Sequence, residues 1–175
     1  DMNIEELKQK AIQTIDQRRE VYLALGRKIY ENPETGYREV KTTQTLADAL
    51  EALGLETERD IAVTGCRARA NAPKEGPKVM GELDSVICLD HPDCDRRTGA
   101  VHACGHNIQT TVMYGIADAF THAGLFDELD GKIDFMAVPA EEYIEMDYRE
   151  GLRREGKLHY FSGKAELTYR GAFDD

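Results

Sequence analysis

A buried strand, a helix and a second buried strand follow one another between residues 78 and 138. Segments 78–83 and 133–138 are short and mostly apolar, as buried strands are. Between them, a helix is predicted to begin with Asn107 as its N-cap and to close near Gly124. Its apolar positions are Ile108, Val112, Ile116 and Phe120. This order of elements favours a parallel pair of strands, so we expect an α/β fold of three layers, with a largely parallel or mixed sheet between helices.

The N-terminal part of the chain has the periodicity of helices. Apolar residues at steps of three and four predict one long helix over residues 4–29, with Arg18 on an exposed turn. A second helix is expected to end at Gly54. Three further segments are typical of strands: 55–63, 66–70 and 165–169.

The charge balance argues against two classes of partner. The chain of 175 residues has 22 Lys and Arg against 33 Asp and Glu, a formal net charge of −11. Nucleic acids and anionic membrane surfaces both require a basic face, so we expect neither as a partner. The N-terminus is charged and the apolar runs are short. The sequence therefore predicts no signal peptide, no membrane span and a cytoplasmic location.

Polar residues gather at the predicted carboxyl ends of the two buried strands. Asp84 follows the first strand, Glu141 and Glu142 follow the second, and Cys104 and His106 directly precede the helix between them. In open α/β sheets the ligand crevice lies at this edge. A thiolate, an imidazole and a carboxylate suit a dication such as Zn²⁺, and an adjacent carboxylate can accept a proton from water that the metal has acidified. These residues therefore predict a catalytic metal site.

Two other interpretations use the same cysteines and histidines. The first is a closed structural zinc site in a small binding module, which leaves the two glutamates without a role and predicts unfolding on chelation. Its ligands would come from Cys88, His91, Cys94, His102, Cys104 and His106. The second is nucleophilic catalysis by Cys104, activated by His102 or His91. Thiol alkylation would abolish such an activity, whereas chelation would not.

Three motifs resemble those of the M20 family of metallopeptidases and amidohydrolases. They are Gly81-Glu82-Leu83-Asp84, His102-Ala103-Cys104-Gly105-His106-Asn107 and Val138-Pro139-Ala140-Glu141-Glu142. Residues 32–36, with Glu39 and Thr42, also fit the N-terminal region of that family. The resemblance spans residues 20–142 and is strongest to the branch of N-acyl-amino-acid, auxin-conjugate and aminobenzoyl-glutamate amidohydrolases.

The resemblance implies a catalytic domain of the zinc-exopeptidase type with two divalent metal ions, which would be Zn²⁺, Mn²⁺ or Co²⁺. It implies that Cys104, His106 and Glu142 are metal ligands, that Glu141 is the general base, and that Asp84 supports the metal site. The expected reaction is hydrolysis of an amide bond in a small N-acyl amino acid or peptide-like substrate.

The sequence also departs from the M20 pattern. Asn107 and Gln109 replace the acidic residue and the histidine of the motif HACGHD-x-H, and the roles of Glu82, Gln109 and His159 stay open. Family members are longer, with a lid or dimerisation domain inserted into the catalytic domain and two later histidine ligands. We therefore expect residues 1–175 to be the N-terminal portion of a split catalytic domain, inactive alone, in a protein that dimerises through the inserted domain.

Overall fold

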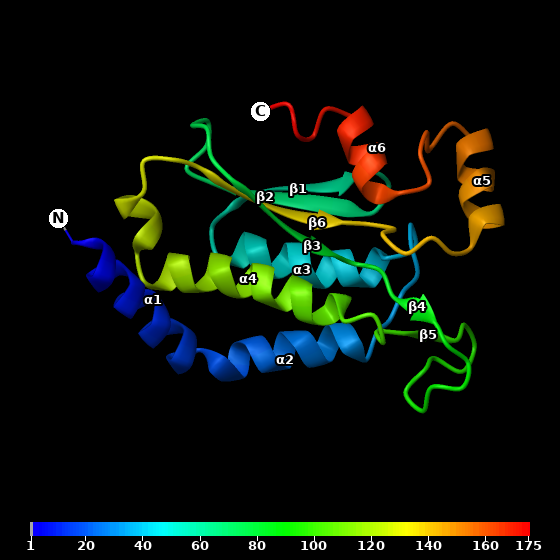
Figure 1. The fold of residues 1–175 in the computed structure, drawn as a ribbon, viewed down its shortest axis with the longest axis horizontal. Helices are drawn as coiled ribbons and strands as arrows, with labels where there is room; N and C mark the ends of the chain where they lie inside the picture. The colour runs from blue at the N-terminus through cyan, green and yellow to red at the C-terminus, as the bar shows by residue number, and fades with distance from the viewer. Residues whose placement is uncertain (1) are drawn as a thin grey trace.

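The computed structural model describes residues 2–175 as a mixed four-stranded sheet with helices on both faces (Figure 1). The helices are α1 (Ile4–Gln17), α2 (Arg19–Tyr30), α3 (Val40–Ala52), α4 (His106–His122), the 3-10 helix η1 (Leu125–Glu128), α5 (Met146–Arg154) and α6 (Gly163–Tyr169). The strands are β1 (Glu56–Ile61), β2 (Gly65–Ala70), β3 (Lys78–Glu82), β4 (Val86–Ile87), β5 (Ala100–Val101) and β6 (Ile133–Val138). The sheet has the order β1-β2-β6-β3, and β4 and β5 form a separate ribbon.

The strand pairing confirms the α/β fold and the predicted parallel pair, which consists of β6 and the edge strand β3. β3 and β6 are parallel neighbours, with Gly81 opposite Ala137 and Glu82 opposite Val138, and α4 lies between them in the sequence. The pairs β1–β2 and β2–β6 are antiparallel, so the sheet is mixed and only one of its three described pairings is parallel. All six residues of β6 are buried, as expected of a strand that is covered on both faces.

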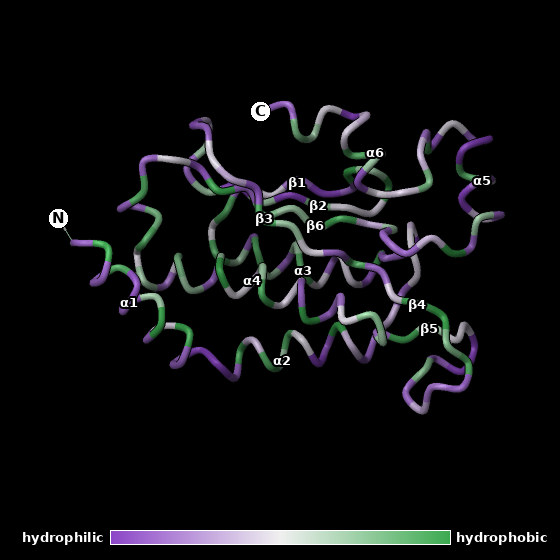
Figure 2. Tube along the Cα trace, viewed as in Figure 1, coloured by the Kyte–Doolittle hydropathy of each residue, from purple (hydrophilic) through white to green (hydrophobic). Residues whose placement is uncertain are grey.

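Helices α3 and α4 cover one face of the sheet and α6 covers part of the other, while α1 and α2 lie outside α4 (Figure 1). Leu46, Met113 and Phe135 belong to the core of the first face, and Leu167 of α6 packs near Met136 on the second. Figure 2 shows hydrophobic residues along β6, and hydrophobic and hydrophilic residues in alternation along α1 and α2. Among residues 2–175, no helix combines the length and the apolar character needed to cross a bilayer.

The single helix predicted over residues 4–29 is wrong, because the chain breaks into α1 and α2 at Arg18. Arg18 has φ −101° and ψ 13°. Its side chain is partly buried rather than exposed as predicted. Its guanidinium donates to both carboxylate oxygens of the buried Asp118 of α4, with Nη2 2.8 Å from Oδ1. The hydroxyls of Tyr22 and Tyr114 donate to the same carboxylate. These contacts hold the junction between α1 and α2 against α4.

Residues 165–169, which the sequence predicts as a strand, lie in α6. The buried residues Gly163, Glu166 and Leu167 are three and four positions apart, which is the period of a helix. Five residues of alternation are too few to distinguish the two periods. Leu167 joins the core on the second face of the sheet, and the Glu166 carboxylate accepts a hydrogen bond from Arg170.

Helix α4 begins at His106, one residue before the predicted start. Gly105 occupies the cap at φ 91°, in the left-handed region that favours glycine. Asn107 is therefore in the first turn rather than at the cap, and its carbonyl accepts a hydrogen bond from the Thr111 hydroxyl at 2.7 Å. The predicted end is confirmed, since Gly124 follows the helix at φ 68°.

Candidate functional site

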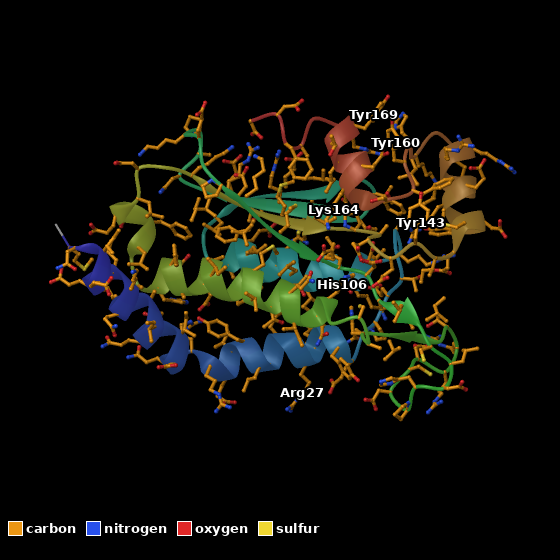
Figure 3. All side chains as sticks on the ribbon, viewed as in Figure 1. Arg27, His106, Tyr143, Tyr160, Lys164 and Tyr169 are labelled. Carbon is orange, nitrogen blue, oxygen red and sulfur yellow. The ribbon has the colours of Figure 1, made fainter. Side chains whose placement is uncertain are left out.

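The parallel pair of β3 and β6 brings five predicted residues to one edge of the sheet. Asp84 follows β3, Glu141 and Glu142 follow β6, and Cys104 directly precedes α4. His106 is the first residue of α4 (Figure 3). One nitrogen, sulfur or carboxylate oxygen from each of Cys104, His106 and Glu142 lies within 4.8 Å of the other two. We refer to these three residues, together with Asp84 and Glu141, as the candidate metal centre.

Asp84 is fully buried and holds both sides of the candidate metal centre. Its carboxylate accepts the backbone N–H of Glu141 at 3.1 Å and that of Glu142 at 2.8 Å. Its carbonyl oxygen lies 2.8 Å from Nδ1 of His106, which must therefore be the protonated ring nitrogen, and 3.7 Å from Sγ of Cys104. This arrangement leaves Nε2 of His106 for other partners, 3.3 Å from Glu141 Oε2 and 3.9 Å from Glu142 Oε1.

The electrostatics of the candidate metal centre favour positive charge. Burial lowers the pKa of His106, but hydrogen bonding to Asp84 and Cys104 outweighs it and raises that pKa to about 11. Burial and the neighbouring Glu141 raise the pKa of Glu142. An environment that binds a proton on imidazole this tightly also suits a cation. Sulfur, imidazole nitrogen and carboxylate oxygen are the donors that Zn²⁺ takes in proteins, so the residues present fit such an ion.

Curated proteins resemble about 70% of this chain, although no protein-family model matches it. Thermostable carboxypeptidase 2 of Saccharolobus solfataricus is 31% identical over 127 residues, which are 69% of this chain and 32% of the relative. The N-acetyldiaminopimelate deacetylase of Bacillus velezensis is 31% identical over 134 residues, 71% of this chain and 34% of the relative. The crystal structure of the Bacillus subtilis YXEP protein, a dinuclear metal binding peptidase from the M20 family, matches 77% of this chain and 36% of its own, with 26% identity and a TM-score of 0.56. The chain belongs to the M20 family.

Membership of the M20 family confirms the resemblance predicted from the three motifs. The chain spans about a third of the length of the curated M20-type relatives that it matches. A crystal structure of a putative aminohydrolase from methicillin-resistant Staphylococcus aureus shares this fold, with a TM-score of 0.66 at 23% identity over 77% of this chain and 35% of that one.

The residues of the alternative zinc module do not gather around one point. Cys88 is exposed, and Cys94 is buried with its Sγ 3.5 Å from the Leu89 carbonyl. Cys104 and His106 form their group with Glu142, and within residues 2–175 this is the one group of three side chains that could hold a metal ion. The M20 arrangement is therefore favoured over a closed cysteine and histidine site.

The cysteine-nucleophile interpretation is not supported either, because neither of the two histidines that it requires is hydrogen-bonded to the thiol within the described chain. His102 is buried, and neither of its ring nitrogens has a hydrogen-bond partner in the described chain. His91 accepts the N–H of Asp93 at Nδ1. Neither imidazole is hydrogen-bonded to Cys104 within residues 2–175.

Three residues whose roles the sequence left open lie outside the group of Cys104, His106 and Glu142. Glu82 pairs with Lys164, with 2.8 Å between Oε1 and Nζ. Gln109 is exposed on α4. His159 has its Nδ1 3.2 Å from Glu166 Oε1, so its ring belongs to the α6 contacts.

Two buried charged residues beside the candidate metal centre were not predicted as part of it: Glu39 and Arg149. Oε1 of Glu39 accepts the N–H of Tyr37 at 3.0 Å and that of Ala140 at 2.9 Å, and the Thr64 hydroxyl donates to the other oxygen. Burial raises the pKa of Glu39 to about 8, against the lowering effect of the Thr64 and Ala140 hydrogen bonds. Glu39 belongs to the N-terminal segment that resembles M20 proteins, which was its only signal in the sequence.

Glu39 is expected to make the protein less stable as the pH rises from about 4.5 to about 8. In that range the native state keeps a proton that the unfolded chain has released, and each pKa unit corresponds to about 1.4 kcal/mol. Urea unfolding of wild type and Glu39→Gln across this range tests the prediction. The variant carries no ionisable group there and should lose less stability as the pH rises; equal slopes would contradict the raised pKa.

Proposed function

We propose that this chain is part of an M20 metallohydrolase that cleaves an amide bond in an N-acyl amino acid or a peptide-like substrate. The observation that carries the proposal is the group of donor atoms from Cys104, His106 and Glu142, within 4.8 Å of one another and beside Glu141. The relatives named a carboxypeptidase and a deacetylase support an amide as the bond that is cleaved.

Cys104, His106 and Glu142 would hold a divalent ion, and the family resemblance assigns a second ion to the complete centre. Zn²⁺, Mn²⁺ and Co²⁺ are the proposed ions. A bound dication supplies a Lewis acid for the carbonyl and lowers the pKa of water. The protein orients its imidazole for this task, since the Nδ1–H of His106 is donated to the Asp84 carbonyl.

Glu141 is the proposed general base. Its side chain is 39% exposed, so a substrate can reach it, while its backbone N–H is fixed by the buried Asp84. On this proposal Glu141 removes a proton from the water that attacks the carbonyl carbon, and it gives that proton to the nitrogen as the C–N bond breaks. Asp84 transfers no proton; it orients Glu141, Glu142 and His106.

The family resemblance also supports a proposal about the organisation of the whole protein. Residues 1–175 would be the N-terminal portion of a split catalytic domain, and two later histidines would complete the metal site. The full-length protein would be a homodimer through its inserted domain. On this proposal the 175-residue chain alone binds metal weakly and is inactive.

Removal of metal is expected to abolish hydrolysis without unfolding the protein. Full-length protein treated with a chelator should stop hydrolysing N-acyl amino acids and should recover on addition of Zn²⁺, Mn²⁺ or Co²⁺. Its circular dichroism should stay that of the folded state throughout. Full activity after chelation would contradict a metallohydrolase, and unfolding on chelation would favour the structural zinc module.

A pair of cysteine variants tests the ligand assignment. Cys104→Ser should weaken Co²⁺ binding and remove the absorption band of a cobalt thiolate. Cys88→Ser, at an exposed cysteine outside the metal-ligating group, is the matched control and should change neither.

A further inference from the structure

The turn of residues 140–142, which carries both proposed glutamates, has its three backbone N–H groups held by buried carboxylates. Ala140 has φ 50°, a left-handed conformation that is uncommon for a residue with a side chain. Its N–H is donated to Glu39, and the next two N–H groups are donated to Asp84. The Ala140 carbonyl accepts the N–H of Gly163 at 3.1 Å. The unusual conformation of the turn is therefore maintained by specific partners.

Arg149 of α5 holds the other end of this turn. Its side chain is fully buried, with Nη2 donating to the Glu142 carbonyl at 2.6 Å and Nη1 donating to the Phe161 carbonyl at 3.0 Å. The guanidinium also lies over the ring of Tyr37, 5.6 Å from its centroid. No carboxylate within residues 2–175 forms an ion pair with Arg149. Arginine is rarely buried, and packing alone would not require its charge. The hydrogen bonds of Arg149 to carbonyls, one of them in the turn, therefore point to a role in holding the turn.

The N-terminal segment leaves space for this contact at Gly36. A Cβ at that position would collide with Nη2 of Arg149 and would come within 2.8 Å of Cα of Ala140. The segment that carries Glu39 therefore lies directly against both the turn and the arginine.

We infer that Glu39 and Arg149 are positioning residues of the candidate metal centre, which fix the 140–142 turn and so set the directions of Glu141 and Glu142. The inference rests on the proposed function and deepens it. Neither side chain supplies a metal-ligating atom; both act through the backbone of the turn. Loss of Glu39 leaves the Ala140 N–H without its acceptor. Loss of Arg149 leaves the Glu142 carbonyl with the Ile144 N–H as its one remaining partner within residues 2–175. Either loss removes a contact that fixes the turn and favours its rearrangement.

Cobalt binding to the full-length protein tests this inference without relying on activity. Glu39→Leu and Arg149→Met remove the hydrogen bonds, whereas Glu39→Gln keeps an acceptor oxygen for the Ala140 N–H. We expect Glu39→Leu and Arg149→Met to weaken Co²⁺ binding about 10–100-fold and to alter the Cys104 thiolate band, as loss of groups that orient metal ligands does elsewhere. Glu39→Gln should stay close to wild type.

The matched control is Glu166→Leu, which also removes a buried carboxylate that accepts backbone N–H groups, those of His159 and Tyr160. It should lower the unfolding temperature and leave Co²⁺ affinity unchanged. An equal loss of affinity in this control would overturn the inference, because the effect would then be general.

Wild-type affinity in folded Glu39→Leu and Arg149→Met would also overturn the inference. If those variants do not fold, Arg149→Lys takes their place: it keeps the charge but not the fork that reaches two carbonyls, and it should bind Co²⁺ several-fold more weakly. Wild-type affinity in Arg149→Lys would then overturn the inference. If the wild-type protein shows no Co²⁺ binding that depends on Cys104, the proposed function fails together with the inference.

Discussion

Glu141→Ala is expected to lower kcat for hydrolysis of an N-acyl amino acid by about 10²–10⁴-fold in the full-length protein, with metal binding retained. The reason is the loss of the proton acceptor beside His106 Nε2, while the three proposed metal ligands stay in place. Steady-state kinetics and metal analysis of the same preparation measure both quantities. Full activity in this variant would rule out Glu141 as the general base.

The neighbouring glutamate supplies the comparison for that experiment. Glu142→Ala should lose activity and metal affinity together, because Glu142 is a proposed metal ligand. Two adjacent carboxylates whose backbones are held by the same aspartate would thus differ in which measurement they affect. Metal loss in Glu141→Ala but not in Glu142→Ala would reverse the two assignments.

Asp118→Ala is expected to destabilise the protein by about 2–3 kcal/mol, because the buried Tyr114 hydroxyl and the partly buried Arg18 guanidinium lose a charged hydrogen-bond acceptor. Asp118 is fully buried and accepts hydrogen bonds from Arg18, Tyr22 and Tyr114. Burial alone would raise the pKa of Asp118, but the hydrogen bonds from Arg18 and Tyr22 outweigh it and keep that pKa below its usual value. This carboxylate therefore stabilises the fold at neutral pH, and its contribution is lost on acidification.

Urea unfolding at pH 7 measures the effect, and Asp48→Ala is the matched control. Asp48 also pairs with an arginine, Arg59, but its side chain is 60% exposed. Ion pairs at the surface contribute little, so this variant should change stability far less than Asp118→Ala. Equal losses of stability in the two variants would mean that burial of the Asp118 carboxylate does not determine its contribution to stability.

The strand–helix–strand unit and five residues of the candidate metal centre could be predicted because they depend on local sequence. Each of them lies at the end of a strand or the start of a helix, where a short motif fixes its place in the chain. Once the two strands were identified, the usual geometry of parallel strands was enough to bring Asp84 and Glu141 together.

Glu39, Arg149 and Arg18 show why the rest could not be predicted. Each is a charged residue in a polar segment, where exposure is the normal expectation. Glu39 accepts a hydrogen bond from Ala140, which is 101 positions away in the sequence, and Arg18 donates to Asp118 across 100 positions. The burial of Glu39 therefore depends on a contact that is remote in the sequence. Contacts over such distances in the sequence leave no periodic signal. The strand predicted over residues 165–169 failed for a related reason, because packing against the sheet decided the conformation of that short segment.

The register of the parallel strands has a consequence for how the metal centre assembles. Glu82 lies opposite Val138, and the two glutamates follow three and four residues later. If β6 slipped by one residue, either Ala140 would replace the base or Tyr143 would replace the ligand. Only one alignment of β6 on β3 therefore places both glutamates at the candidate metal centre, and an ion held there as proposed would stabilise that alignment over its neighbours. On the proposed function, metal affinity would therefore also depend on the correct register of the sheet.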